Sequence, residues 1–212
     1  MKKINKTTLI VTSVITLLPI LAGLILWSKL PDTIPTHFAM DGTPNGWSSK
    51  AFTVFGLPAL LLVFHLVCLV GTSQDPKYDA ISNKLFGIVL WTCPVISILV
   101  AMTCYTAALG MTLNISKYMI VGTGILLMVI GNYLPKCKQN YTMGIKIPWT
   151  LDDEENWNHT HRFAGFLWVI GGVFVIISAF FEWEWMFLVI VFLMTGIPMI
   201  YSYLYFRKNR KK

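Results

Sequence analysis

The chain has 212 residues, of which 55% are hydrophobic and only 13% are charged, and its net charge at pH 7 is +7. Soluble domains carry about 25% charged residues, so this composition excludes an ordinary soluble fold and indicates an integral membrane protein. The positive charge does not require a nucleic-acid partner, because basic flanks hold membrane helices against the anionic headgroups of the lipid bilayer. We therefore predict no direct contact with nucleic acid.

Six long apolar runs, none of which contains Asp, Glu, Lys or Arg, follow one another along the chain. They cover residues 8–27, 51–70, 85–109, 118–134, 163–181 and 185–206. A helix needs about 20 residues to cross the hydrocarbon core, whereas a membrane strand is half as long and alternates in polarity. We therefore predict an all-α integral membrane protein with six transmembrane helices, forming a single membrane domain over residues 1–212.

The basic residues predict the orientation. With the N-terminus in the cytoplasm, 14 of the 17 Lys and Arg residues fall in inner segments, and only Lys29, Lys50 and Lys117 fall in outer ones. Positive charge near helix ends is retained on the cytoplasmic side. We expect a multi-pass protein of the plasma membrane with both termini cytoplasmic, the loop 28–50 outside and the segment 135–162 inside. The run 8–27 is too long for a typical signal core and lacks an A-x-A site, so we interpret it as a retained anchor.

The outer loop 28–50 is rich in Pro, Gly, Asp and Asn, which set turns rather than helix. Asp41-Gly42 and Asn45-Gly46 are turn dipeptides that supply the positive φ of a tight reversal. We expect an ordered loop that holds His37, Phe38 and Trp47 at the membrane surface. The alternative is that Phe38 and Trp47 only anchor the loop in the lipid headgroups.

His65 lies inside the second run, where an ionisable side chain is a candidate for function. The alternative is a neutral histidine that is hydrogen-bonded to a neighbouring helix. Of the four cysteines, Cys68, Cys93 and Cys104 lie within runs and Cys137 lies in the inner segment. No outer loop offers a pair of cysteines, so disulfides are not expected to stabilise the fold.

The inner segment 135–162 breaks into two parts. Pro135 stops the fourth helix, and Ile147 is pushed toward extended angles by Pro148, so the GIKIPW stretch is expected to be extended.

After that stretch, Thr150 is a predicted N-cap, and Asp153 sits three residues on in a capping-box-like position. The four acids 152–155 then lie at the positive end of a helix dipole, which accounts for them without catalysis. This helix is expected to run from Leu151 through Trp157 and His161, which share one face.

The inner segment contains residue types that are typical of metal binding and of hydrolysis. His159, His161 and Cys137 suggest a metal, but residues two apart on a helix point to opposite faces, so we predict neither a metal nor a cofactor. The chain has no HExxH, GxSxG or Walker motif and no acid within a run, so we predict no catalytic residues and no enzyme.

Two stretches of the chain resemble a known family. GNYLPKCKQNYTMGIKIPWTLDDEENWNHTHRFAG is similar to the signature of the SdpI family of bacterial membrane proteins. LPDTIPTHFAMDGTPNGWSSK is similar to the N-terminal module found with that signature, with its Ile-Pro-x-His-Phe, Gly and Trp-x-x-Lys. The resemblance implies a membrane immunity protein that protects its cell from a secreted peptide toxin. It also implies signal transduction, in which a small winged-helix repressor is sequestered at the cytoplasmic side.

The matching positions are the candidate contact residues that the resemblance implies. The candidates for toxin contact are Pro35, His37, Phe38, Gly42, Trp47 and Lys50. The candidates for the inner signature and repressor contact are Asn132, Asn140, Gly144, Lys146, Pro148, Trp149, Thr150, Trp157 and Arg162. Where the family usually has Arg-Thr before Pro-Trp, this chain has Lys146-Ile147, which keeps the charge but loses the planar guanidinium group.

A small-solute transporter or channel is the alternative function. Pro19, Pro58, Pro94 and Pro198 lie inside runs and could break helices around a pathway. The absence of acidic and basic residues from the runs argues against it.

Overall fold

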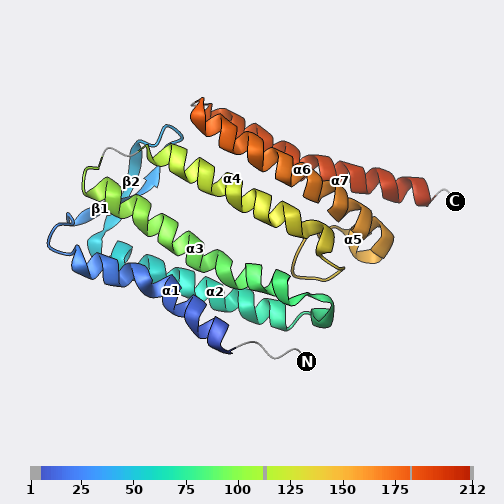
Figure 1. Ribbon diagram of the computed structural model, residues 1–212, viewed down its shortest axis with the longest axis horizontal. Coiled ribbons are helices and arrows are strands. Elements are labelled where there is room, and N and C mark those ends of the chain that lie inside the picture. The colour runs from blue at the N-terminus through green and yellow to red at the C-terminus, as the bar shows by residue number, and fades with distance from the viewer. Residues whose placement is uncertain (1–5, 112–113, 182, 211–212) are drawn as a thin grey trace. The chain divides into compact units, whose positions relative to one another are not determined.

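The computed structural model describes residues 6–111, 114–181 and 183–210, and most of this part of the chain is helical (Figure 1). Within it, six helical segments are long and apolar enough to cross a membrane. They are Lys6–Ile25, Phe52–Ser73, Asn83–Ala108, Ser116–Lys136, Glu154–Phe180 and Trp185–Asn209. The predicted all-α fold with six membrane-spanning helices is confirmed, and the chain is a multi-pass membrane protein. The side of the membrane on which the termini lie stays a prediction.

The elements follow one another in a simple order. They are α1 (Lys6–Ile25), β1 (Thr33–Phe38), β2 (Pro44–Ser49), the π-helix η1 (Phe52–Gly56), α2 (Leu57–Ser73), the 3₁₀ turn η2 (Tyr78–Ala80), α3 (Asn83–Ala108), α4 (Ile115–Tyr133), the 3₁₀ turn η3 (Leu134–Lys136), α5 (Pro148–Asp152), α6 (Glu154–Phe180) and α7 (Glu184–Asn209). The described residues form two compact units: Met1–Gly71 with Phe86–Ser116, and Thr72–Leu85 with Lys117–Lys212. The single membrane domain over 1–212 stays a prediction.

In the first unit, polar side chains of α3 bond to backbone carbonyls of α1. The Ser97 hydroxyl donates to the Thr16 carbonyl at 2.7 Å, and the Tyr105 hydroxyl donates to the Pro19 carbonyl at 3.1 Å. Such bonds join helices in a medium that offers no water to satisfy polar groups. The buried apolar core beside them consists of Leu30, Ile34, Val54, Cys104 and Tyr105.

The predicted outer loop contains an antiparallel hairpin, here called the hairpin (residues 33–49), in which β1 pairs with β2. The turn between the strands contains Gly42, whose φ of +82° is left-handed. A hydrogen bond from the Gly42 N–H to the Ala39 carbonyl, at 3.0 Å, closes this turn. The predicted turn at Asp41-Gly42 is confirmed. The predicted turn at Asn45-Gly46 is wrong, because Gly46 lies within β2 opposite His37 and lacks a positive φ.

In the second unit, α4 and α6 pack through glycines. A Cβ on Gly131 would lie 3.0 Å from the Gly165 carbonyl oxygen, and a Cβ on Gly172 would lie 2.7 Å from the Gly124 carbonyl oxygen. Each helix thus presents two glycines seven residues apart, which lets the backbones approach closely. On α6, the Trp168 indole also donates to the Met194 carbonyl of α7 at 2.9 Å, and these two helices lie side by side in Figure 1.

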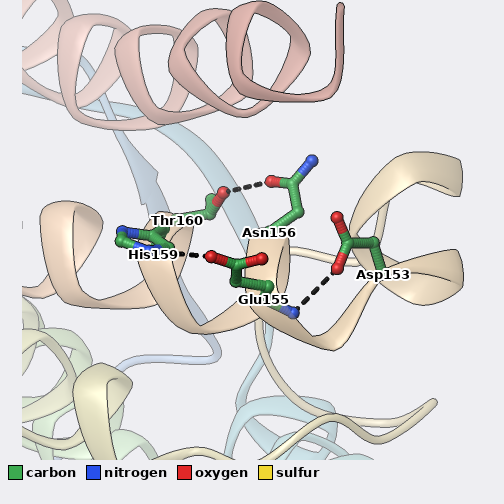
Figure 2. Close-up of polar contacts among 5 residues, drawn as sticks. All are labelled: Asp153, Glu155, Asn156, His159 and Thr160. Atoms are coloured by element: carbon green, nitrogen blue, oxygen red, sulfur yellow. Dashed lines mark hydrogen bonds and ion pairs between the residues drawn. The ribbon is translucent and has the colours of Figure 1, made fainter. Parts of the chain in front are cut away.

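The start of the acidic helix differs from the prediction. Pro148 occupies an early position in the short helix α5, and Asp153 is the N-cap of α6, its carboxylate accepting the Glu155 N–H at 2.8 Å (Figure 2). The predicted N-cap at Thr150 is wrong, because proline's fixed φ already begins a helical turn two residues earlier. The predicted start of this helix at Leu151 is also wrong, because α6 begins at Glu154 and runs without a break into the membrane span. Pro148 and Trp149, which were expected to be extended, lie in α5.

Candidate functional site

Residues 141–150, here called the strap, connect the end of the fourth membrane helix to α6, and Asn140 fixes how the strap begins. Its side-chain oxygen accepts the backbone N–H groups of Thr142 at 2.9 Å and Met143 at 2.6 Å. Its side-chain nitrogen donates to the Lys138 carbonyl at 2.8 Å. Because Asn140 is buried, these bonds form away from water and define one tight turn.

The middle of the strap lies on a stacked pair of rings from α6. Trp157 and His161 stack with ring centroids 4.0 Å apart and planes 20° apart, so the predicted shared face is confirmed. The Ile145 N–H donates to Nε2 of His161 at 2.9 Å, and Nδ1 lies 2.8 Å from the Trp157 carbonyl. A backbone N–H can only donate, so Nε2 accepts and the ring proton sits on Nδ1.

Gly144 allows this close approach. Its φ is +106°, and a Cβ there would collide with the His161 imidazole and lie 3.1 Å from the Trp157 ring. Trp157 is also held from its other end, since its indole N–H donates to the Cys137 carbonyl at 2.6 Å. The signature thus needs glycine here for a reason of space as well as of backbone angle.

The end of the strap is closed by Thr150. Its hydroxyl accepts the Ile147 N–H at 3.1 Å and lies 2.8 Å from the Ile145 carbonyl, to which it can donate. Trp149 packs against α7, with its ring 5.4 Å from that of Tyr203 and 6.0 Å from that of Phe206. Pro148 is exposed beside it and sets the backbone of the turn.

The turn between α2 and α3 contributes residues that the sequence did not single out. Asp75 is only 6% exposed, and one of its carboxylate oxygens accepts both the Tyr141 N–H and the Thr142 hydroxyl, each at 2.8 Å. The Lys77 ammonium group donates a hydrogen bond to the Gln139 side-chain oxygen. No sequence signal distinguishes Asp75 from Asp79, which lies in the same short turn.

Gln139 carries this contact to the far end of the strap. Its side-chain nitrogen donates to the carbonyls of Thr150 and Leu151, at 2.8 Å each. Lys77 and Gln139 therefore connect the α2–α3 turn to the strap's last residue, while Asp75 holds its first two.

The polar residues at the start of α6 have separate roles, and Figure 2 shows the contacts among Asp153, Glu155, Asn156, His159 and Thr160. Asp153 caps the helix, and the Glu155 carboxylate lies 3.8 Å from Nε2 of His159. Asn156 accepts the Thr160 hydroxyl at 2.9 Å and donates to the Ser202 carbonyl of α7 at 3.1 Å. His159 is exposed and stacks on Tyr205 of α7, whereas His161 is buried under the strap, so the two imidazoles do not face a common metal.

Three predicted inner residues lie on the surface. Lys146 is exposed and donates only a local bond, from Nζ to the Thr142 carbonyl at 2.9 Å. Asn132 is exposed near the end of α4, and Arg162 is exposed on α6. These three residues therefore differ from the other inner candidates, which shape the strap through its backbone or pack beneath it.

In the hairpin, exposed apolar side chains sit on a rigid base. Pro35 is buried, Phe38 is half-buried, and Trp47 is 59% exposed. The turn is fixed to the first turn of α4, since the Ser116 hydroxyl donates to the Met40 carbonyl at 2.7 Å and Gly42 packs against the Ser116 backbone. His37 bonds through Nδ1 to the Asn45 side chain on the opposite strand.

Two charged residues stabilise the ends of the hairpin. Lys50 lies 3.3 Å from the Trp27 carbonyl, 3.4 Å from the Asp32 carboxylate and 5.2 Å from the Trp27 ring centre, so its charge is already engaged. At the turn, hydrogen bonds from the Thr43 hydroxyl and N–H hold the pKa of Asp41 below its ordinary value.

His65 is buried and lies within 3.2 Å of the Thr12 hydroxyl of α1 through Nε2. A hydrogen bond from His65 to a neighbouring helix is the alternative to a functional role that the sequence analysis gives. Its Nδ1 has no partner among the described residues.

Comparison with known proteins gives a consistent result. Residues 136–202 match the model of the SdpI/YfhL protein family, and residues 14–62 match that of a Domain of unknown function (DUF1648). The Immunity protein SdpI of Bacillus subtilis (strain 168) is 29% identical over 206 residues, which cover 94% of this chain and 96% of the relative. No solved structure gives a significant match. The two matched regions contain the strap and the hairpin, and the resemblance to the SdpI family is confirmed.

Proposed function

We propose that this chain, whose residues 136–202 match the SdpI/YfhL family, protects its bacterium from a secreted peptide toxin. The observation that carries the proposal is the similarity over 94% of the chain to a bacterial protein named for immunity. That similarity covers both polar stretches between the membrane helices. It supports a membrane immunity function and favours binding over catalysis.

The hairpin is the toxin-facing surface in this proposal. Trp47 at 59% exposure and Met40 at 45% exposure present apolar area on a rigid base, where a membrane-active peptide would enter the bilayer. The two strands form a two-stranded sheet within the described residues, so each has an edge that an extended peptide could join. Phe38, His37, Pro35, Gly42 and Lys50 then support the contact by fixing the shape of the hairpin.

The strap and the start of α6 form the cytoplasmic surface, and a winged-helix repressor is the partner that we assign to it. Lys146 and Arg162 offer exposed positive charge, and Asp152 and Glu154 offer exposed negative charge. The buried residues Asn140 and Thr150 hold the backbone beneath these charges.

A protection assay tests the proposal. A sensitive bacterium that expresses the chain is challenged with a killing peptide secreted by the bacterium from which the chain comes. Survival is compared between cells that contain the chain or its variants at equal abundance in the membrane and cells that lack it. We expect protection by the unchanged chain, weaker protection by the double variant Phe38→Ala and Trp47→Ala, and full protection by Trp185→Ala. Trp185 is a matched control because it is an exposed tryptophan at the start of α7 and does not belong to the hairpin. Unchanged killing with the unchanged chain would overturn immunity to that peptide.

One of the prolines that suggested transport lies in an unbroken helix. Pro19 is inside α1, which runs from Lys6 to Ile25, and its carbonyl accepts the Tyr105 hydroxyl of α3 in a contact between packed helices. We find no specific observation that favours a transporter or channel.

A further inference from the structure

The strap is attached at both ends to a turn that lies far from it in sequence. At the beginning, Asp75 accepts the Tyr141 N–H and the Thr142 hydroxyl on one oxygen and the Lys77 N–H on the other, at 2.7–2.8 Å. At the end, Lys77 bonds to Gln139, which donates to the Thr150 carbonyl. Bonds to a buried carboxylate are among the stronger ones in proteins.

The strap covers an aromatic surface. Trp157 is 0% exposed and His161 is 1% exposed, and the Ile145 N–H occupies the free nitrogen of the imidazole. Gly144 lies against both rings, so the strap excludes solvent from them directly. If the strap lifted, the stacked rings would face the cytoplasmic side of the protein in the predicted orientation.

The strap itself has little regular structure to resist lifting. Residues 141–147 lie in neither helix nor strand, and several of their backbone groups bond to the side chains of Asn140, His161 and Thr150. Segments held mainly by such contacts open at lower free energy than helices do. The bonds from the α2–α3 turn therefore decide how often the strap opens.

We propose that the strap is a lid, latched by Asp75 and Lys77, that gates access of a cytoplasmic protein to the Trp157–His161 ring pair. A partner that inserts an apolar side chain fits such a surface. Along the chain, one helical stretch, residues 52–73, separates the hairpin from Asp75. The identity of the partner rests on the proposed function; the latch does not.

Carbethoxylation of histidine by diethyl pyrocarbonate, read by mass spectrometry on the full chain in detergent, tests the latch. His161 is shielded in the closed lid, and the exposed His159, two residues away, is an internal reference. We expect Asp75→Ala to raise the modification rate of His161 about tenfold and to leave that of His159 unchanged. Asp152→Ala is the matched control, since it removes an exposed carboxylate from the same region and should change neither rate.

A second pair of variants separates latch from fold. Thr142→Val removes the hydroxyl that donates to Asp75, and Thr142→Ser retains it. If Asp75→Ala does not fold, faster modification of His161 in Thr142→Val and an unchanged rate in Thr142→Ser support the latch. Unchanged His161 modification in the folded variants overturns it. The assay contains neither toxin nor repressor, so the latch and the immunity function can fail separately.

Discussion

At the scale of single residues, the positions that match the family signature divide by burial. Asn140, Thr150 and Trp157 are buried, and their polar atoms bond to the backbone of the signature segment. Lys146 and Arg162 are exposed. A buried polar side chain is costly to leave without partners, so the first group fixes the backbone. The exposed group has little effect on folding and is free to contact a partner.

Gly144→Ala is expected to destabilise the strap. The residue would hold an L side chain at a φ of +106° and place its Cβ 3.1 Å from the Trp157 ring, in addition to the collision with His161. We expect a loss of about 1–3 kcal/mol, seen as a lower melting temperature in detergent. Gly87→Ala is the control, because Gly87 in α3 has open space around it and should tolerate a methyl group. Equal melting temperatures for the two variants would contradict this account.

Cys137 is expected to react slowly with maleimides although it lies in a polar segment. Burial, reinforced by the nearby Asp75 charge and opposed by a hydrogen bond from Asn140, raises the pKa of its thiol from 9.0 to about 11. The thiolate is the reactive form, so between pH 7 and 10 the labelling rate should rise about tenfold per pH unit. Peptide-resolved mass spectrometry measures the rate. A rate that levels off near pH 9 would show an ordinary thiol.

At the scale of elements, the strap joins α4 to α6 as one ordered unit, and Lys146 separates its structural role from its binding role. The ammonium group bonds to the Thr142 carbonyl within the strap, so Lys146→Ala should change the free energy of unfolding by less than about 0.5 kcal/mol and leave the melting temperature nearly unchanged. It should nevertheless weaken protection or repressor recruitment, and Lys146→Arg should preserve them. If Lys146→Ala unfolds the protein, the residue is a structural clasp.

The pairing of α4 with α6 depends on glycine. A Cβ on Gly131 would lie 2.8 Å from the Cβ of Trp168, and one on Gly172 would lie 2.6 Å from the Cγ of Met128. Gly131→Ala and Gly172→Ala should each push the helices apart and cost about 1–3 kcal/mol. Gly196→Ala in α7 is the control, because nothing lies within 4 Å of its Cβ position. Thermal unfolding in detergent compares the three, and equal stability would mean that the helices do not pack this closely.

At the scale of the whole molecule, the number of membrane spans could be predicted because the thickness of the hydrocarbon core fixes the length of an apolar run. The ends could not, since polar residues continue a helix beyond the apolar run. The clearest case is α6, which begins at Glu154 rather than near residue 163 because Asp153 caps it there. Local chemistry likewise predicted the Asp41-Gly42 turn and the shared face of Trp157 and His161.

The contacts that build the candidate site are long-range, and the sequence did not indicate them. Asp75 meets Thr142 across 67 positions, and Asn156 meets Ser202 across 46. The β-strands were also missed, because the hairpin is short and contains Pro, Gly and Asn, which are depleted in strands. A single sequence carries no signal for such pairings, whereas the resemblance to a family located both segments without giving their geometry.

The orientation of the molecule is the property on which both proposed surfaces depend. The distribution of basic residues, 14 against 3, predicts that the hairpin lies outside and the strap lies inside. Labelling with a membrane-impermeant maleimide in intact cells tests this, using Met40→Cys at the hairpin turn and Asp152→Cys beside the strap. Both side chains are exposed, and replacing Asp152 spares the helix cap at Asp153.

We expect Met40→Cys to be labelled in intact cells and Asp152→Cys only after lysis. The unchanged chain serves as the blank, because its own Cys137 is buried and Cys68, Cys93 and Cys104 lie in membrane-spanning helices. The reverse pattern would place the hairpin in the cytoplasm, where a secreted toxin does not meet it, and would overturn the assignment of both surfaces together. Three membrane spans lie between residues 40 and 152, so the two positions are expected on opposite sides of the membrane. Labelling of both positions in intact cells would therefore contradict the number of spans between them.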